Sequence, residues 1–162
     1  MKKEQIKKMI EIALSQLAYS YTPYSDFKVG AALLGKNGRI YTGCNIENAA
    51  YTPTNCAERT AFFKAVSEGV KEFDAICIVG GKGGVVTEYA PPCGVCRQVM
   101  MEFCDPDDSE AQSLVILSRF PVSFFIPSLF PFLQKSSFRV RVLSHSVRLD
   151  GPKPFGNISF KV

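Results

Sequence analysis

Apolar side chains follow two periods along the first 118 residues, and these periods predict where helices and strands lie. Near the N-terminus, apolar residues recur every three or four positions between lysines and glutamates, which predicts a helix over residues 4–18 with one buried face. Strand-like runs follow at 28–34 and 39–42, and the turn between them contains Asn37 and Gly38, a pair that tolerates the positive φ of a tight hairpin. The chain is therefore expected to begin with a helix and a β-hairpin.

Helices and strands alternate in the rest of this region. In order, we expect a helix that reaches Glu68 and is capped by Thr54 or Asn55, a strand over residues 74–80, a helix over residues 93–104 and a strand over residues 113–117. This order predicts one α/β unit, in which helices pack on a mixed β-sheet.

Length and composition agree with a single soluble domain. The chain has 162 residues, within the usual range of about 100–200 residues for one domain. Its apolar runs are all shorter than the ~18 residues that a membrane-spanning helix needs. Six cysteines in a chain without an export signal predict reduced thiols. Among these, Cys77 is expected to be buried, and Cys44 and Cys104 to be inert thiols at the ends of elements. We therefore expect a cytoplasmic protein with no membrane partner.

Charge is distributed unevenly between the two parts of the chain. Residues 1–118 hold 12 basic and 14 acidic side chains, whereas residues 119–162 hold seven basic residues and one acidic residue. Arg139, Arg141 and Arg148 are expected in a solvated basic strand or tail. An enzyme that acts on nucleic acid usually carries its basic surface beside its active site, so we expect no nucleic-acid partner.

Two cysteine motifs supply the candidate chemistry. Cys56 and Glu58 form a Cys-x-Glu motif, and Cys93 and Cys96 form a Pro-Cys-x-x-Cys motif. Three thiolates favour Zn²⁺ and leave a fourth tetrahedral position for water, and this pair of motifs is typical of zinc nucleoside and nucleobase deaminases. A structural zinc site and a redox-active cysteine pair are the alternatives. We predict one Zn²⁺ held by Cys56, Cys93 and Cys96.

Three neighbouring side chains complete this hypothesis. Glu58 is expected to carry protons, because a carboxyl group beside a negatively charged metal shell has a raised pKa. Arg59 lies one helical turn after Cys56 and is expected to donate a hydrogen bond to a metal-bound sulfur, and Gln98 is a second candidate for that contact. The alternatives are a glutamate favoured by the helix dipole and ordinary polar surface residues.

Longer segments carry a resemblance to a known family. These segments are Pro23 to Ser25, Phe27 to Leu33, Gly43 to Ala49, Cys56 to Ala61, Lys64 to Gly69 and Pro92 to Val99. Through residues 1–118, the chain resembles the homotetrameric cytidine deaminases. The resemblance implies a three-layer α/β fold, in which helices pack on both faces of a mixed sheet, and one Zn²⁺ per subunit of a homotetramer. It also implies the hydrolytic deamination of the nucleosides cytidine and 2′-deoxycytidine, which yields the uridine products and ammonia.

The same resemblance implies three contacts to the nucleoside. Phe27 would present its ring to the pyrimidine, and Asn45 and Glu47 would form hydrogen bonds with ribose hydroxyls. A carboxylate that accepts from a sugar hydroxyl makes a strong, charge-assisted contact. Core packing for Phe27 and a polar turn for the other two residues are the alternatives.

Residues 119–162 depart from the family pattern and are treated as a separate, divergent segment. It is rich in proline and basic residues and holds eight of the 13 phenylalanines. In the family, an aromatic residue near the C-terminus reaches a neighbouring subunit's site. Candidate substitutes here are Phe124, Phe125, Phe130 and Phe132. An abrupt change of this kind also fits a shifted reading frame or alternative splicing.

Several other functions are alternatives at this stage. One is a deaminase of another cytosine nucleoside, such as blasticidin S. Another is an enzyme that edits polynucleotides, which residues 1–118 disfavour because they lack a basic cluster. The third is a non-catalytic zinc-binding homologue, either because the altered tail disables assembly or because a fourth protein ligand such as His145 closes the metal site.

Overall fold

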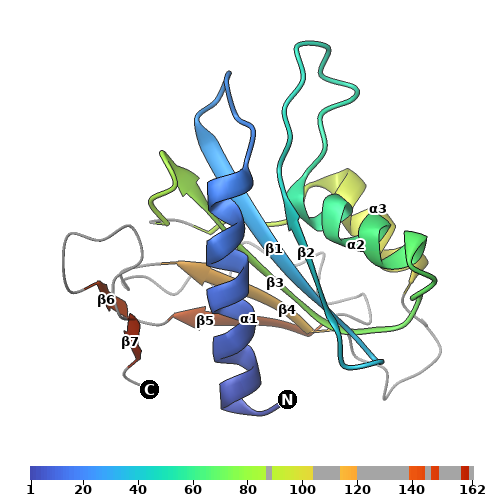
Figure 1. Ribbon diagram of the computed structural model, residues 1–162, viewed down its shortest axis with the longest axis vertical. Helices are drawn as coiled ribbons and strands as arrows, with labels where there is room; N and C mark the ends of the chain where they lie inside the picture. The colour runs from blue at the N-terminus through green and yellow to red at the C-terminus, as the bar shows by residue number, and fades with distance from the viewer. Residues whose placement is uncertain (87–88, 104–113, 120–138, 145–146, 150–157, 161–162) are drawn as a thin grey trace.

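The chain forms an α/β structure whose elements follow the predicted order (Figure 1). The computed structural model describes residues 1–86, 89–103, 114–119, 139–144, 147–149 and 158–160, and of the last four ranges only the backbone. The helices are α1 (Lys3–Gln16), a 3₁₀ turn η1 (Leu17–Tyr19), α2 (Ala57–Ser67) and α3 (Gly94–Glu102). The strands are β1 (Phe27–Gly35), β2 (Ile40–Cys44), β3 (Phe73–Lys82), β4 (Leu114–Arg119), β5 (Arg139–Ser144), β6 (Val147–Leu149) and β7 (Ile158–Phe160).

Five of the strands form one mixed sheet in the order β2-β1-β3-β4-β5. β1 is antiparallel to both β2 and β3, while β4 runs parallel to β3 and to β5. β6 and β7 form a separate antiparallel pair. The mixed sheet predicted from the sequence is confirmed.

Alternate residues of the strands face two different hydrophobic cores, one on each side of the sheet. On one side, α1 packs its buried residues Ile6, Met9, Ile10 and Ala13 against Ala32, Leu34, Ala75, Cys77 and Val79. On the other side, α2 and α3 pack against Ala31, Leu33, Ile76 and Ile78. Because side chains alternate along a strand, β1 and β3 contribute to both cores. This arrangement confirms the three-layer fold with helices on both faces (Figure 1).

Two glycines let helices approach the strands at backbone contact. A Cβ atom on Gly30 of β1 would lie 2.1 Å from the carbonyl oxygen of Ala13 in α1. A Cβ atom on Gly43 of β2 would lie 2.2 Å from the carbonyl oxygen of Ala57 in α2. Only a residue without a side chain fits such spacings, so Gly43 fixes how closely the first turn of α2 approaches the sheet.

The local predictions are largely confirmed, with one correction. The hairpin is present, and Gly38 has a φ of 79° in its turn. The expected cap of α2 by Thr54 or Asn55 is wrong, because Cys56 is the N-cap residue. Asn55 instead pairs through its backbone with Ile46, which keeps it in extended geometry. Cys77 is fully buried, as predicted.

The region after Phe103 is described only through its strands. Arg139 and Arg141 lie in β5 and Arg148 lies in β6. The backbone of these arginines is therefore in strands, which is one of the two environments, strand or tail, expected from the sequence. Cys104, His145 and the four candidate phenylalanines lie outside the described residues. Within the described part of the chain, no helix is long and apolar enough to cross a membrane.

Candidate metal centre

The starts of two helices bring the three predicted metal ligands together. Cys56 is the N-cap residue of α2, and Cys93 is the N-cap residue of α3. Both have extended backbone geometry, and the Cys93 sulfur accepts a hydrogen bond from the backbone N–H of Cys96 at 3.4 Å. The partial positive charge at a helix start favours thiolate over thiol. Each helix therefore presents its sulfur ligands at an end suited to anions.

The three sulfur atoms are spaced as one tetrahedral zinc ion requires. All lie within 4.8 Å of one another, with 3.9 Å between Cys56 and Cys93 and 3.4 Å between Cys93 and Cys96. Tetrahedral geometry with Zn–S bonds of about 2.3 Å places sulfurs about 3.8 Å apart. The donor set fits Zn²⁺, and in the described part of the chain it is the one group of three or more such side chains close enough to hold a metal.

The thiols of Cys56 and Cys96 differ in the direction in which their pKa values are shifted. The pKa of the Cys56 thiol is lowered to about 5, chiefly by a hydrogen bond from Cys96 and further by Arg59. The pKa of Cys96 is raised, because its proton is held by Cys56 and because the side chain is buried. Since the thiolate is the metal-binding form, Cys56 is prepared for a metal.

Arg59 lies against the first ligand. Its Nη2 atom donates to the carbonyl oxygen of Thr54 at 2.9 Å and contacts the Cys56 sulfur at 3.8 Å. Its Nε atom is buried without a hydrogen-bond partner among the described residues. The guanidinium therefore stands where it can offset the negative charge of three thiolates. Gln98 is exposed, and within the described residues its side chain makes no hydrogen bond to the sulfurs.

Glu58 is the only charged side chain found buried in the described residues, with 4% of its surface exposed. It lies in the first turn of α2, two residues after Cys56. Burial raises the pKa of its carboxyl group to about 7, and the nearby charge of Cys56 acts in the same direction. A carboxyl group with such a pKa can both accept and donate a proton near neutral pH.

The three candidate nucleoside contacts lie around the start of β1. Phe27 opens the strand and packs, half-buried, against the core beneath α2. The Asn45 side chain accepts from the N–H of Val29 and donates to the carbonyl oxygen of Phe27, each at 2.8 Å. Asn45 therefore holds in place the strand end that carries Phe27.

The Glu47 carboxylate is also in use within the chain. It accepts hydrogen bonds from the N–H groups of Tyr24 and Ser25 at 3.0 and 3.3 Å, and from the Ser25 hydroxyl. The Ser25 hydroxyl is the main reason why the pKa of Glu47 is lowered. These contacts are not evident from the sequence, because no local pattern marks a hydrogen bond between residues more than 20 positions apart.

A three-sulfur zinc site beside a buried, protonatable carboxyl group defines the class of zinc-dependent hydrolytic enzymes. The family model for the cytidine and deoxycytidylate deaminase zinc-binding region matches residues 3–107. The chain therefore belongs to the cytidine and deoxycytidylate deaminase family.

Individual proteins show the same relationship. The chain is 55% identical over 100 residues to the cytidine deaminase of Sporosarcina psychrophila, and the aligned region covers 62% of this chain and 71% of that protein. It is 52% identical over 99 residues to the cytidine deaminase of Halalkalibacterium halodurans, with coverages of 61% and 72%. The crystal structure of cytidine deaminase from Burkholderia pseudomallei superposes with a TM-score of 0.60 and 43% identity, covering 72% of this chain and 84% of that one.

Proposed function

We propose that this chain catalyses the zinc-dependent hydrolytic deamination of cytidine and 2′-deoxycytidine, which yields uridine or 2′-deoxyuridine and ammonia. The observation that carries the proposal is the cluster of Cys56, Cys93 and Cys96 sulfurs beside the buried Glu58. The named relatives are cytidine deaminases, which supports a cytosine nucleoside as the substrate. The comparisons do not favour a non-catalytic homologue or a blasticidin S deaminase.

Glu58 is the proton carrier in this proposal. A zinc ion held by Cys56, Cys93 and Cys96 would supply an acidified water, because open zinc sites lower the pKa of water from about 15.7 toward about 7. A Glu58 carboxylate oxygen accepts a proton from the attacking water, and the carboxyl group gives that proton to the ring nitrogen next to the amino-bearing carbon. A second proton passes through the same side chain to the amino group, which leaves as ammonia. The pKa of about 7 suits both directions of transfer.

Substrate binding is assigned to the surface around the start of β1. The Phe27 ring offers an apolar face to the pyrimidine. Asn45 acts through its two bonds to β1, in addition to any contact with the ribose. Glu47 already holds Ser25, so a ribose hydroxyl would replace the serine hydroxyl or add to it. Arg59 and Gln98 are assigned to the surroundings of the metal, although only Arg59 contacts a sulfur within the described residues.

The proposal also covers the assembly of the chain and its location in the cell. We assign the chain to a cytosolic homotetramer that binds neither nucleic acid nor membranes, with residues 1–118 as the catalytic domain and residues 119–162 as a divergent segment. Several large apolar side chains are exposed among the described residues, where they are available for contacts between copies. They include Tyr21 and Tyr24 before β1, Tyr51 before α2, and Val95 in α3. Sedimentation of the zinc-loaded chain measures the number of copies.

A turnover assay tests the reaction itself. The purified chain, loaded with Zn²⁺, is mixed with cytidine, and conversion to uridine is followed by ultraviolet absorbance and by release of ammonia. Cytosine, blasticidin S and single-stranded RNA are compared at equal concentration. We expect cytidine and 2′-deoxycytidine to be converted and the other three to be poor substrates. No conversion of either nucleoside by the zinc-loaded chain contradicts the proposal.

A further inference from the structure

Helix α2, which carries Cys56 and Glu58, lies directly on the edge strand β2. The sheet order leaves β2 with one neighbouring strand, β1. Gly43 brings the two elements to backbone contact, because its missing side chain leaves room for the carbonyl of Ala57 and the N–H of Ala61. The buried apolar residues of α2 on this side of the sheet are Ala57, Ala61, Phe62 and Ala65. Apolar contacts are non-directional and do not by themselves fix how far the helix slides along the strand.

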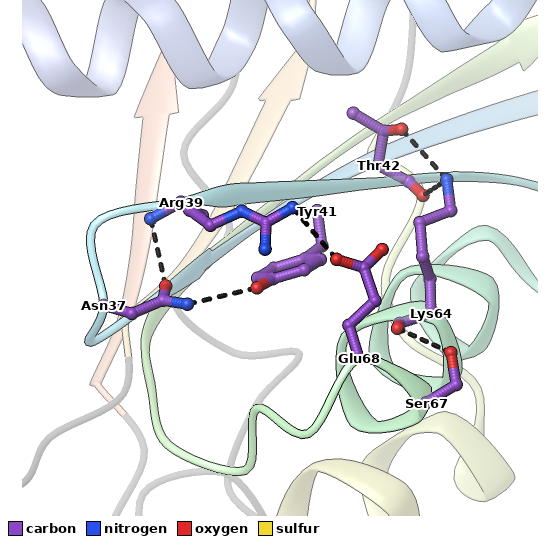
Figure 2. Close-up of polar contacts among 7 residues, drawn as sticks. All are labelled: Asn37, Arg39, Tyr41, Thr42, Lys64, Ser67 and Glu68. Carbon is purple, nitrogen blue, oxygen red and sulfur yellow. Dashed lines mark hydrogen bonds and ion pairs between the residues drawn. The ribbon is translucent and has the colours of Figure 1, made fainter.

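A stripe of polar side chains on one side of α2 makes directional contacts that can fix the position of the helix along β2. Thr60 and Lys64 of α2 and the C-cap residue Glu68 recur every four residues and therefore lie on one side of the helix. Thr60 and Lys64 meet Cys44 and Thr42 of β2, and Glu68 meets Arg39, the residue just before β2. The outermost contact is an ion pair in which Nη2 of Arg39 lies 2.9 Å from Oε2 of Glu68 (Figure 2).

Lys64 makes the central contact of the stripe. Its ammonium group donates to the carbonyl oxygen of Thr42 at 2.6 Å and to the Thr42 hydroxyl at 3.2 Å (Figure 2). Thr60 makes the contact nearest the metal centre. Its hydroxyl lies 3.0 Å from the carbonyl oxygen of Cys44 and 3.2 Å from that of Cys56, and it accepts from the Asn55 amide at 3.1 Å.

The two carbonyl groups that receive these bonds point away from the sheet. Backbone hydrogen bonds join Gly35 to Arg39 at one end of the hairpin and Val29 to Asn45 at the other. In an antiparallel pair, hydrogen-bonded and non-hydrogen-bonded positions alternate, so Thr42 falls at a non-hydrogen-bonded position. Cys44, two residues further along β2, also falls at a non-hydrogen-bonded position. Their carbonyls face off the edge of β2, where the helix side chains satisfy them.

We propose that Lys64 and Thr60 are positioning residues, which fix the register of α2 on β2 and so hold Cys56 and Glu58 at the sulfur ligands of α3. Cys93 and Cys96 belong to a different helix, so a slide of α2 along β2 would change the spacing between sulfurs that must share one ion. This inference rests on the proposed zinc-dependent deamination.

Lys64→Met is the first test, because methionine keeps the apolar stem and removes the donor. Lys64→Arg restores a donor, and Lys71→Met is the matched control, since Lys71 is an exposed lysine between α2 and β3. Each chain is loaded with Co²⁺, whose absorption spectrum reports the geometry of thiolate ligands, and separately with Zn²⁺ for kcat and KM. We expect Lys64→Met to lower kcat about tenfold, as outer-sphere changes at metal sites do, with little change in KM. The cobalt spectrum of Lys64→Met should also shift. Lys64→Arg should recover most of the wild-type kcat and cobalt spectrum, and Lys71→Met should match the wild type in both.

Thr60 gives a second, independent pair of variants. Thr60→Val keeps the shape of the side chain and loses its hydrogen bonds, whereas Thr60→Ser keeps the hydroxyl. We expect the cobalt spectrum and kcat to change in Thr60→Val and to be preserved in Thr60→Ser. This pair keeps the test decisive if Lys64→Met does not fold.

The outcomes separate this inference from the proposed function. If Lys64→Met and Thr60→Val only lower the melting temperature, with wild-type spectra and kcat, the residues are structural and the inference is wrong. An equal loss in Lys71→Met also overturns it, because the effect would then come from charge alone. If the wild-type chain shows neither a cobalt–thiolate spectrum nor turnover, the proposed function itself fails.

Discussion

Glu58 combines two properties that rarely occur together in one side chain. It is charged by type, yet only 4% of its surface is exposed, and it lies near the Cys56 sulfur, whose negative charge also raises its pKa. Both surroundings disfavour the carboxylate and stabilise the protonated form. In the proposed mechanism, this environment keeps the pKa of Glu58 in the range that proton transfer needs.

Glu58→Gln separates proton transfer from metal binding. Glutamine has almost the same shape but cannot exchange a proton, so we expect kcat to fall by about 10²–10⁴, the range attributed to general acid–base catalysis. Zinc content, measured by atomic absorption, should stay at one ion per chain because the three sulfurs are untouched. Glu72→Gln, at an exposed glutamate 4.0 Å from Lys36, is the control and should keep full activity. Near-normal turnover in Glu58→Gln would remove this residue from the mechanism.

At the scale of elements, the site depends on how two helix starts are brought to one point. α2 rests on β2 through Gly43, while α3 supplies the other two sulfurs. A backbone-to-backbone contact leaves no side chain that could yield, so the position of α2 is sensitive to a single added carbon atom. The distance between Cys56 and Cys93 therefore depends on a glycine more than ten residues before either of them.

Gly43→Ala tests this contact. The new Cβ would lie 2.2 Å from the carbonyl oxygen of Ala57 and 2.6 Å from the N–H of Ala61, so α2 must move. We expect a loss of about 1–3 kcal/mol in the free energy of unfolding, as for other overpacked sites. Thermal unfolding with circular dichroism measures it. Gly94→Ala is the stability control, because its Cβ would meet nothing closer than 3.9 Å. An unchanged melting temperature in Gly43→Ala would show that α2 is not held by this contact.

The sequence predicts most of the elements and the metal ligands, but not the contacts that place them. Periodicity locates the helices and the hairpin, and the cysteine spacing identifies the three sulfurs, because both patterns are local. The cap of α2 was mispredicted because Asn55 pairs with Ile46, a partner nine residues away. The bonds of Glu47 to the turn before β1 and of Lys64 to Thr42 join distant segments. Composition and spacing carry no record of such pairs.

At the scale of the whole molecule, one ion links two helices that have few other contacts. Cys56 lies at the start of α2, Cys93 and Cys96 lie at the start of α3, and Phe62 in the middle of α2 stacks on Phe103 at the end of α3, at 5.7 Å between ring centres. Because the unfolded chain does not hold the sulfurs together, metal binding contributes to the stability of the fold.

Removal of zinc is therefore expected to lower the melting temperature. A ligand at 1,000 times its Kd stabilises the folded state by about 4.1 kcal/mol, and for a chain of this size each kcal/mol corresponds to about 2–4 °C. Calorimetry before and after treatment with a strong chelator measures the shift. Zn²⁺ should restore the original transition and Mg²⁺ should not, because Mg²⁺ prefers oxygen ligands. Identical transitions with and without the chelator would contradict a zinc link between the helices.

The side chains that α2 places along the border of β2 also limit how copies of this chain can associate. An incoming strand extends a sheet by bonding to free backbone groups at its border, which is a common route to aggregation. At Thr42 and Cys44 those carbonyls are already bonded to Lys64 and Thr60. Growth of the sheet past this border is thereby disfavoured, because an added strand would have to displace the side chains of Lys64 and Thr60.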